Sequence, residues 1–379
     1  MFDQRINKLR EILREKKIDA LLISNFFNIF YLTGFRGLSE SEREAWVLIT
    51  GRDCYLFTDA RYVDILSSRD PKGRDDLFRN DINIKLITRE KKLLQHLEEI
   101  IRDEKINSLG FEGEDLKFFE YQGLKNKFNK IKLVPTTQLI VRLREIKEIK
   151  EIEKLTKAAE IGDKCLTDIV KTIKNGQKEK EIAWKIEKWL KEKGYDYSFY
   201  PIIAFDENSA IPHYDTKAGS NKKLKKGSVI LIDFGVKYQG YCSDITRMFF
   251  LNRPKTNIMN IYNILLATQQ KTINLLTTRR SSLSYKDIDE YCRQQLAMNK
   301  HQLTYPHSTG HGVGLEVHEY PKLSLSSEDI LQSNQIFTVE PGIYFEGKWG
   351  MRIEDTILFN KKCGVEVLTK FSKGLMIIK

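Results

Sequence analysis

Residues 227–251 read GSVILIDFGVKYQGYCSDITRMFFL, two β-rich runs separated by a polar turn, and this pattern predicts a β-hairpin. We place the turn between Tyr238 and Gln239. Asp233 and Asp244 then lie directly opposite each other, with their Cβ atoms roughly 5 Å apart. Two facing carboxylates repel, and Asp is disfavoured within strands, so the pair costs stability unless a cation neutralises it. The hairpin therefore predicts a bound cation, and a metal ion is the simplest one.

A second hairpin of the same kind is predicted at residues 337–359, which read FTVEPGIYFEGKWGMRIEDTILF. Glu340 and Glu354 are equidistant from Gly347, so a hairpin folded at this glycine again brings two carboxylates face to face. One such pair on its own is more often an accident of the surface than a site. Two pairs in corresponding places of two hairpins favour a functional site.

Between the two acidic pairs, residues 307–319 read HSTGHGVGLEVHE and contain half of the six histidines in the chain. These histidines are His307, His311 and His318. A lone histidine is usually structural, whereas three in one short glycine-rich stretch favour a site over a packed core. Gly310, Gly312 and Gly314 are expected to let the backbone approach a ligand closely.

The chemistry that suits this combination of residues is hydrolysis. Four carboxylates and one imidazole form an oxygen-rich ligand set, which suits manganese, cobalt or iron(II) and lacks the thiolates of structural zinc sites. Bridging carboxylates can hold two ions about 3.5 to 4 Å apart, where they activate a shared water and polarise a substrate carbonyl. A serine or cysteine mechanism has less support, because no G-x-S-x-G motif occurs and Cys242 has no histidine near it in sequence.

Outward from the hairpins, the hydrophobic pattern predicts two domains. Up to residue 137, short β-rich runs alternate with helical patterns, which is typical of an α/β domain. The β-rich runs are residues 20–24, 46–50, 55–58 and 82–88. A charged segment with apolar residues at helical spacing follows at 146–155 and predicts a connecting helix.

The rest of the chain predicts a helix, helix, hairpin unit that is used twice. The helices are predicted at residues 161–174, 181–193, 258–276 and 287–299. Each pair precedes one of the two hairpins, so we expect a domain that closes through two related halves facing each other across a cleft. The predicted fold class is α/β (α+β), with domains at residues 1–137 and 138–379.

Composition is ordinary for two globular domains: of 379 residues, 41% are hydrophobic and 30% charged. The longest apolar runs are far too short to span a bilayer, and the first residues read as a charged amphipathic helix and not as an export signal. Five cysteines without paired spacing fit free thiols in a reducing compartment. We therefore expect a cytoplasmic protein without a membrane partner.

The net charge of +11 raises the question of a nucleic-acid partner. The basic residues are spread along the chain, and their densest run, 222–226, directly precedes a predicted strand, where a solvated loop is expected. We therefore expect no nucleic-acid partner.

Over nearly its whole length the chain resembles the aminopeptidase P and prolidase family of metallopeptidases. The N-terminal part of the resemblance rests on NIFYLTGF (28–35) and TDARY (58–62). The C-terminal part rests on IDFG with SDITR, HSTGHGVG, EPGIY and RIED. The resemblance implies a creatinase-like N-terminal domain and a pita-bread catalytic domain with two divalent metal ions, Mn²⁺ foremost and Co²⁺, Fe²⁺ or Zn²⁺ as alternatives. It implies the ligands Asp233, Asp244, His311, Glu340 and Glu354.

The resemblance also implies a role for five residues near the substrate. His307, the His318 of VHE and the His213 of NSAIPH would line the substrate pocket. Glu340 would act as a proton shuttle as well as a ligand, and Arg352 would orient the ligands. The chain departs from the family at Phe205 and Asp206, where most relatives are expected to have a glycine, and this loop is expected to alter the mouth of the pocket.

The activity that this resemblance implies is an Xaa-Pro aminopeptidase, which releases an N-terminal residue next to proline. The alternative is an Xaa-Pro dipeptidase (prolidase), and less favoured alternatives are a metal-free creatinase-like hydrolase and a non-catalytic binding relative. Both of the latter lack ligands that this chain keeps, and methionine aminopeptidases usually lack such an N-terminal domain. Peptides with proline in second position are the expected substrates, and the family implies a homodimer.

Overall fold

The computed structural model describes residues 2–62, 82–219, 221–279, 283–298 and 303–378. Contacts divide the chain into two compact units, Met1–Arg144 and Glu145–Lys379, called here the N-terminal and the C-terminal unit. The division into domains at 1–137 and 138–379 stays a prediction. Within the described ranges, no helix is both long enough and apolar enough to cross a membrane.

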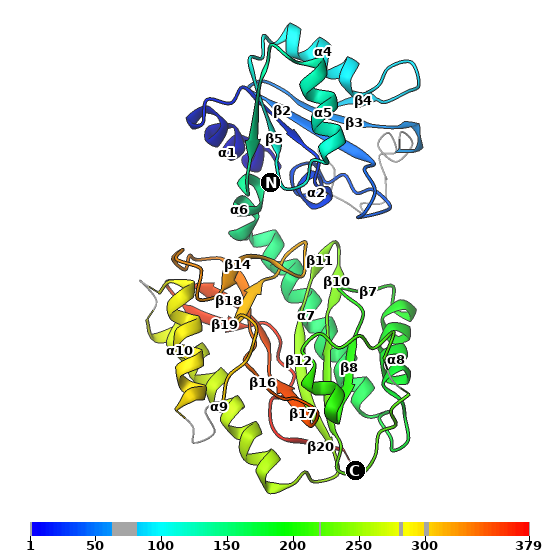
Figure 1. Ribbon diagram of the computed structural model, residues 1–379, viewed down its shortest axis with the longest axis vertical. Helices are drawn as coiled ribbons and strands as arrows, with labels where there is room; N and C mark the ends of the chain where they lie inside the picture. The colour runs from blue at the N-terminus through cyan, green and yellow to red at the C-terminus, as the bar shows by residue number, and fades with distance from the viewer. Residues whose placement is uncertain (1, 63–81, 220, 280–282, 299–302, 379) are drawn as a thin grey trace. The chain divides into compact units, whose positions relative to one another are not determined.

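The N-terminal unit is built on a six-stranded mixed sheet (Figure 1). Its strands are β1 (Ala20–Ile23), β2 (Ala45–Thr50), β3 (Cys54–Thr58), β4 (Asn83–Leu86), β5 (Ser108–Glu112) and β6 (Lys132–Thr136), in the order β4-β3-β2-β1-β5-β6. Its helices are α1 (Phe2–Glu15), α2 (Phe26–Thr33), α4 (Leu93–Asp103), α5 (Phe118–Lys127) and the 3-10 turn η1 (Ala60–Tyr62), and α6 (Leu139–Glu145) runs up to the boundary. The predicted α/β class is confirmed, whereas β5 and β6 were not predicted.

The sheet of the N-terminal unit has a core on its central strands. Every residue of β1 and β2 is buried, which is the pattern of strands covered on both faces. Helix α4 contributes Leu97 and Ile100 to a cluster with Leu22, Leu48 and Leu109 of the sheet. The apolar residues of α4 recur at helical spacing, so the helix can bury one face and keep its charged face in water.

The first half of the C-terminal unit consists of two helices followed by a long hairpin. The helices are α7 (Ile149–Val170) and α8 (Glu179–Glu192), and after them come β7 (Asp196–Tyr197), β8 (Ile202–Phe205) and the 3-10 turn η2 (Asp206–Ala210). The hairpin, called here the first hairpin, comprises β9 (Val229–Phe234), β10 (Val236–Tyr238), β11 (Tyr241–Cys242) and β12 (Ile245–Leu251).

The second half repeats this order. Its helices are α9 (Thr256–Thr278) and α10 (Tyr285–Ala297), followed by β13 (Gly310–Gly312) and β14 (Glu319–Leu323). The second hairpin comprises β15 (Gln335–Val339), β16 (Gly342–Phe345), β17 (Trp349–Arg352) and β18 (Asp355–Asn360), and β19 (Gly364–Val367) and β20 (Met376–Ile378) end the chain. The predicted helix, helix, hairpin unit used twice is thus confirmed.

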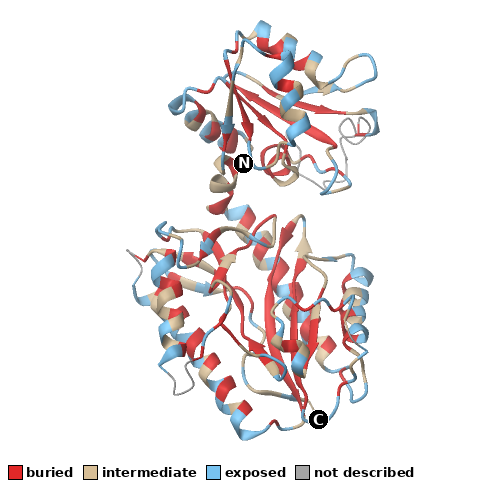
Figure 2. Ribbon diagram, viewed as in Figure 1, coloured by how far each residue is buried: buried red, intermediate tan, exposed pale blue. Residues whose placement is uncertain are grey.

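Two sheets carry the long parts of the hairpins. One has the order β20-β12-β9-β8 and the other β14-β13-β15-β18-β19. Helices α7 and α8 pack on the first sheet through Leu166 and Ile186, and α9 and α10 pack on the second through Leu276 and Ile288. Figure 2 shows the strands of this unit largely buried and the exposed residues mainly on the helices and in the loops. Burial of both hairpins explains why polar residues on them need partners.

Helix α7 corrects one detail of the prediction. The connecting helix expected at 146–155 and the helix expected at 161–174 are one continuous helix, because residues 156–160 contain no helix breaker and Ala158 and Ala159 pack inside. The helix predicted at 287–299 corresponds to α10, and the end of that prediction, Asn299, lies outside the described residues.

The register of the first hairpin differs from the prediction. Asp233 pairs with Thr246 and not with Asp244. The turn consists of Gln239 and Gly240, whose φ angles are 49° and 87°, and so lies one residue later than predicted. Since Asp244 stands two residues before Thr246, it lies diagonally from Asp233 on the same face of the hairpin.

The register of the second hairpin is as predicted. Val339 pairs with Asp355 and Gly342 with Arg352, so that the hairpin is symmetrical about Gly347. The residues between these pairs include Glu340 and Glu354, which therefore stand opposite each other where the hairpin leaves one sheet for another.

Candidate metal centre

Four carboxylates and one imidazole come together in the C-terminal unit. Ligand atoms of Asp233, Asp244 and Glu354 all lie within 4.8 Å of one another. The same holds for His311, Glu340 and Glu354. Glu354 belongs to both groups and links them. The five residues predicted as metal ligands therefore form two overlapping groups, each of which could hold an ion.

The carboxylates are buried and repel one another, which disfavours their charged forms. Burial, followed by repulsion from Glu354 and Asp233, raises the pKa of Asp244 well above its usual value. Burial and then repulsion from Glu340 raise the pKa of Glu354 in the same way, and burial raises the pKa of Glu340 to about 8. The buried Oδ1 atoms of Asp233 and Asp244 have no hydrogen-bond partner among the described residues. Such oxygens fit a divalent cation.

Arg352 of β17 is the cation that the structure places beside this cluster. Its side chain is buried and forms an ion pair with Asp233 through Nη2. It also donates from Nε to Thr246 Oγ1 at 3.1 Å, and from Nη1 to Tyr344 Oη at 3.0 Å and to the carbonyl of Pro212 at 3.2 Å. The surrounding carboxylates and Tyr344 raise the pKa of Arg352 further despite its burial, so the guanidinium stays charged.

Two threonines that the sequence did not single out orient the carboxylates. Thr246 donates to Glu354 Oε2 at 2.6 Å. Thr338 donates to Glu340 Oε1 at 3.2 Å and accepts the N–H of His311 at 3.1 Å. Each threonine stands two positions from a predicted ligand in sequence, and residues two apart on a strand share a face. This spacing of two residues is the sequence signal that could have identified the two threonines.

His311, a predicted ligand, is neutral and has a nitrogen lone pair available. Burial lowers its pKa to about 3, and its Nδ1 lies 3.2 Å from the carbonyl oxygen of Gly312. A carbonyl only accepts, so Nδ1 carries the proton and Nε2 has a free lone pair. Nε2 lies 3.2 Å from Glu340 Oε1 and 3.6 Å from Asp244 Oδ2. A proton on Glu340 satisfies this contact in the metal-free protein, and a metal ion can replace that proton.

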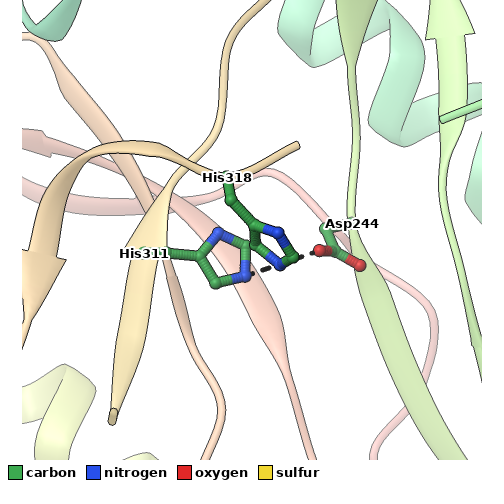
Figure 3. A group of neighbouring side chains, drawn as sticks. All are labelled: Asp244, His311 and His318. Atoms are coloured by element: carbon green, nitrogen blue, oxygen red, sulfur yellow. Dashed lines mark ion pairs between the residues drawn. The ribbon is translucent and has the colours of Figure 1, made fainter. Parts of the chain in front are cut away.

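His318 lies against His311. The ring centroids are 4.3 Å apart at an interplanar angle of 81°, and Figure 3 shows the two rings next to each other beside Asp244. His311 belongs to β13, whereas His318 lies in the loop before β14. Asp244, His311 and His318 form a third group whose ligand atoms lie within 4.8 Å of one another. His318 is exposed, unlike Asp244, and so borders the centre from the solvent side.

The other two predicted pocket histidines lie near the same place. Burial lowers the pKa of His307 to about 4, with smaller contributions from Arg352 and His213. His307 Nε2 lies 2.9 Å from Tyr344 Oη. His213 also contributes to the lowered pKa of His318, after burial, so the structure brings the three histidines within electrostatic reach. Tyr344 was not predicted, although it stands two residues from Gly342 in the EPGIYF motif.

Helix α10 holds the loop that carries these histidines. Arg293 donates to the carbonyl of His307 at 2.5 Å, and Asp289 accepts the N–H of Thr309 at 3.1 Å. Arg293 and Asp289 also bond to each other at 3.0 Å, one helical turn apart. The ion pair of Arg293 and Asp289 on α10 therefore fixes the loop that carries His307.

The three glycines of this loop do not serve the purpose that the sequence suggested. A Cβ atom at Gly310 would stand 1.9 Å from the carbonyl oxygen of Thr338, and one at Gly312 would stand 2.1 Å from that of Tyr320. A Cβ atom at Gly314 would stand 2.1 Å from Glu319 Oε1. The glycines thus make room for the chain's own atoms, and the expected close approach of the backbone to a ligand is not what requires them.

Asp206, at the predicted departure from the family, has a left-handed backbone with φ 49°. Glycine adopts this conformation without strain, so the glycine expected in relatives would fit here. The Asp206 carboxylate accepts the N–H of Val229 at 2.9 Å and the hydroxyl of Ser228 at 3.0 Å. The side chain therefore ties η2 to the start of β9. Its predicted effect on the mouth of the pocket stays a prediction.

Comparison with known proteins covers both units. Residues 153–361 match metallopeptidase family M24, and residues 5–146 match the creatinase/prolidase N-terminal domain. The Xaa-Pro dipeptidase of Pyrococcus horikoshii is 33% identical over 377 residues, which cover 99% of each chain. The solved structure of an Xaa-Pro dipeptidase from Bacillus anthracis has a TM-score of 0.88 at 32% identity and covers 100% of both chains. That of an X-Pro aminopeptidase from Thermotoga maritima has a TM-score of 0.84 at 30% identity, over 96% of this chain and 98% of that one.

These matches confirm the fold and the family that the sequence motifs indicated. The fold is a creatinase-like N-terminal α/β domain followed by a pita-bread catalytic domain with two related halves. With a family match over more than half of its length and a relative above 30% identity along almost all of it, this chain belongs to metallopeptidase family M24.

Proposed function

We propose that this protein is an Xaa-Pro dipeptidase that works with two divalent metal ions. The observation that carries the proposal is the buried cluster of four carboxylates and a neutral imidazole, in which two carboxylate oxygens have no hydrogen-bond partner among the described residues. The aminopeptidase that we first expected is less well supported, because the relatives from P. horikoshii and B. anthracis are Xaa-Pro dipeptidases. The T. maritima relative keeps the Xaa-Pro aminopeptidase as the second candidate.

Five residues would hold the ions: Asp233, Asp244, His311, Glu340 and Glu354. When bound, two divalent ions would supply a nucleophile derived from water near neutral pH and would polarise the scissile carbonyl. Manganese remains the expected metal, because a set of mainly carboxylate ligands with one imidazole suits it. Cobalt, iron(II) and zinc remain alternatives.

Glu340 is the proposed proton shuttle. In the metal-free protein burial raises the pKa of Glu340 to about 8, so this carboxyl group binds a proton more readily than an ordinary glutamate, which favours it as a general base. Its Oε1 is held by Thr338 and faces His311, and its Oε2 lies 4.0 Å from Arg352 Nε. In this role Glu340 would take a proton from the attacking water and deliver it to the nitrogen of the leaving proline.

The three histidines would line the substrate pocket. His307 is neutral at pH 7, and its Nδ1 lies 2.8 Å from the carbonyl oxygen of Ser308, so Nδ1 carries the proton and Nε2 accepts from Tyr344 Oη beside Arg352. His213 and His318 are exposed on the solvent side of the carboxylates. The N–H groups of the His213 and His318 imidazoles can donate to the carboxylate of a dipeptide and to the developing tetrahedral oxyanion. Arg352 itself would keep Asp233 in place and is a positioning residue in this scheme.

Specificity for proline follows from what the imino acid lacks. Its nitrogen carries no hydrogen and its ring fixes the backbone, so a peptidase that relies on that N–H loses its hold and a shaped pocket is needed. A free amino group on the preceding residue would pair with the carboxylates, which fixes the scissile carbonyl and makes the attack effectively intramolecular.

Further expectations accompany this proposal. A homodimer is proposed from the family resemblance. A cytoplasmic location, the absence of a nucleic-acid partner and the domain division at 137 and 138 likewise stay predictions.

The test is a substrate and metal panel on the purified full chain. Ala-Pro, Ala-Pro-Ala, Ala-Ala and acetyl-Ala-Pro are assayed after chelation and after addition of manganese, cobalt or zinc. We expect Ala-Pro to be cleaved fastest, in the presence of metal only. Faster cleavage of Ala-Pro-Ala would identify an aminopeptidase. Comparable cleavage of Ala-Ala would refute the proline preference, and activity of the chelated protein would favour the metal-free alternative.

A further inference from the structure

The C-terminal unit contains a fully buried ion pair that the proposed chemistry does not use. Lys147 Nζ lies 2.7 Å from Glu319 Oε1, and the two side chains are 1% and 2% exposed. The lysine precedes α7, whereas the glutamate begins β14, so the pair joins segments 172 residues apart. Charges this deep are retained only where they are matched, because removal from water costs each of them its hydration.

Glu319 is the anchor of the loop that carries His318. It directly follows His318 in sequence and pairs with Gly312, the neighbour of His311, across the β13–β14 ladder. Its Oε2 accepts the N–H of Glu316 at 3.4 Å. Gly314 lacks the Cβ atom that would stand 2.1 Å from Oε1. Residues 313–318 therefore fold around the Glu319 carboxylate.

The lysine end of the pair is itself fixed. The N–H of Lys147 donates to the carbonyl of Asn334 at 2.8 Å, just before the second hairpin. Two residues earlier, Glu145 accepts from Gln335 Nε2 at 2.6 Å. The ammonium group therefore extends from a backbone that is tied to the second hairpin, and the ion pair transmits that fixed position to the His318 loop.

The middle of the loop is held from the other hairpin. Cys242 of β11 donates its N–H to the carbonyl of Gly314 at 2.8 Å, and its thiol lies 3.6 Å from the carbonyl of Leu315. The loop thus rests on the first hairpin at its middle and on Lys147 at its end. Only the second of these contacts is adjacent to His318.

We infer that Lys147 is a positioning residue, whose buried ion pair with Glu319 holds His318 in the place where it meets substrate. The inference rests on the proposed function, since it takes His318 as a substrate-binding group. Figure 3 shows what is being held: the His318 ring stands at the His311 ring, beside Asp244. A small shift of the loop moves this imidazole relative to the ligands without moving the ligands themselves.

The experiment removes both charges of the pair, because Lys147→Met alone leaves the Glu319 charge buried and unpaired. We expect Lys147→Met with Glu319→Gln to bind manganese as the wild type does, and to lose about ten- to hundredfold in kcat on Ala-Pro. In a His318→Ala background the same two changes should lower kcat by less than about threefold, because residues that act together are not additive. Lys157→Met, which removes an exposed ion pair with Glu160 on α7, is the matched control and should leave kcat unchanged.

A second measurement does not depend on the substrate. Hydrogen exchange of the amides of residues 313–318 in the manganese-loaded protein should be about tenfold faster in the double variant than in the wild type or in Lys157→Met. Unchanged exchange, an unchanged kcat, or losses that multiply with His318→Ala would each overturn the inference. If the wild type cleaves no Xaa-Pro substrate, the proposed function fails, and hydrogen exchange alone then decides whether Lys147 positions the loop.

Discussion

The two hairpins of the C-terminal unit solve the same problem in different ways. In both, a pair of carboxylates stands where the hairpin passes from one sheet to another. In the second hairpin Glu340 and Glu354 are opposite each other, and each accepts a hydrogen bond from a threonine. In the first hairpin Asp233 and Asp244 are diagonal, and each keeps a buried oxygen without a hydrogen-bond partner among the described residues.

This difference shows that the two hairpins contribute different groups to the centre. Among the described residues, Arg352 of the second hairpin is the only arginine whose guanidinium forms an ion pair with a carboxylate of the cluster. Its nearest partner is Asp233 of the first hairpin. The bare oxygens of the first hairpin are therefore the part of the centre that most needs a metal ion. Changes in the two hairpins should accordingly act in opposite directions on the metal-free protein.

The largest effect is expected from Asp244→Asn. Manganese affinity should fall by at least about a thousandfold and activity should be lost, because a carboxylate with a bare oxygen is removed from the site. The metal-free variant should stay folded and become more stable, since repulsion from Glu354 and Asp233 is relieved. Calorimetric titration with manganese and thermal unfolding of the chelated protein measure both. Two ions bound at wild-type affinity would break the five-ligand assignment.

Arg352→Met should have the opposite effect on stability, because it should destabilise the metal-free protein. Without the guanidinium, the Asp233 charge is buried and unpaired, which should cost the metal-free protein about 3 to 5 kcal/mol. Manganese should recover most of this loss because the ion replaces the missing positive charge. Denaturant unfolding with and without manganese tests the pair of values. An equal loss in both states would contradict the different contributions of the two hairpins.

Changing His213 or His318 to Ala tests the role of the substrate pocket separately from metal binding by the carboxylates of the two hairpins. Both ions should remain bound, and turnover of Ala-Pro should fall about a hundredfold, as expected for loss of one donor to the developing oxyanion. Metal content and kcat are measured on the same samples. A variant with wild-type turnover would remove that histidine from the site.

Protons should compete with manganese for the carboxylates and not for His311. Below about pH 8 Glu340 keeps a proton in the metal-free protein, whereas His311, with a pKa of about 3, is already neutral. Manganese affinity should therefore rise about tenfold per pH unit for each proton displaced, between about pH 5 and 8. Titrations at several pH values test this, and an affinity that does not change with pH would contradict it.

The same shift has a consequence for stability. The pKa of Glu340 is about 8 in the folded protein and near 4.5 in an unfolded chain, so this group stabilises the metal-free fold at low pH. That contribution is lost as the pH rises to about 8. The melting temperature of the chelated protein should thus fall over this range relative to that of the manganese-loaded protein, by about 2 to 4 °C for each kcal/mol.

The smallest effect is expected at Asp206, which ties η2 to the start of the first hairpin. Asp206→Ala loses the bonds to Ser228 and Val229 and keeps the left-handed strain. Asp206→Gly loses the same bonds but relieves the strain, so it should be more stable than Asp206→Ala by about 1 kcal/mol. Manganese affinity should be unchanged in both. Equal stability of the two variants would show that the backbone conformation relaxes.

The second hairpin was predictable because its turn lies at a glycine in the centre of a symmetrical pattern. Gly347 has φ 68°, and the register follows from it. In the first hairpin the turn needs positive φ at Gln239 as well as at Gly240, and glutamine gives no signal of such a conformation. The predicted register was therefore wrong by two positions, although the two aspartates still share a face.

What the sequence could not indicate are contacts between distant segments. The ion pair of Lys147 and Glu319 and the bond from Arg352 to the carbonyl of Pro212 each depend on tertiary packing. Lys147 lies in a run of charged residues that reads as a solvated helix surface, and only the fold shows that its side chain is inside. Motifs indicated the predicted ligands because the residue types and spacing of these ligands are local patterns. The residues that support the predicted ligands have no such local pattern.

The division of the centre between the hairpins also bears on how the protein is made. Asp233 and Arg352 are 119 residues apart, and Thr246 and Glu354 are 108 apart. At 5 to 20 residues per second, a ribosome needs roughly 6 to 24 s to get from the first hairpin to its counterpart. A nascent chain thus exposes two aspartates long before their partners exist. Because long-range pairings of this kind form late in folding, peptidase activity should appear only after synthesis of the second half is complete.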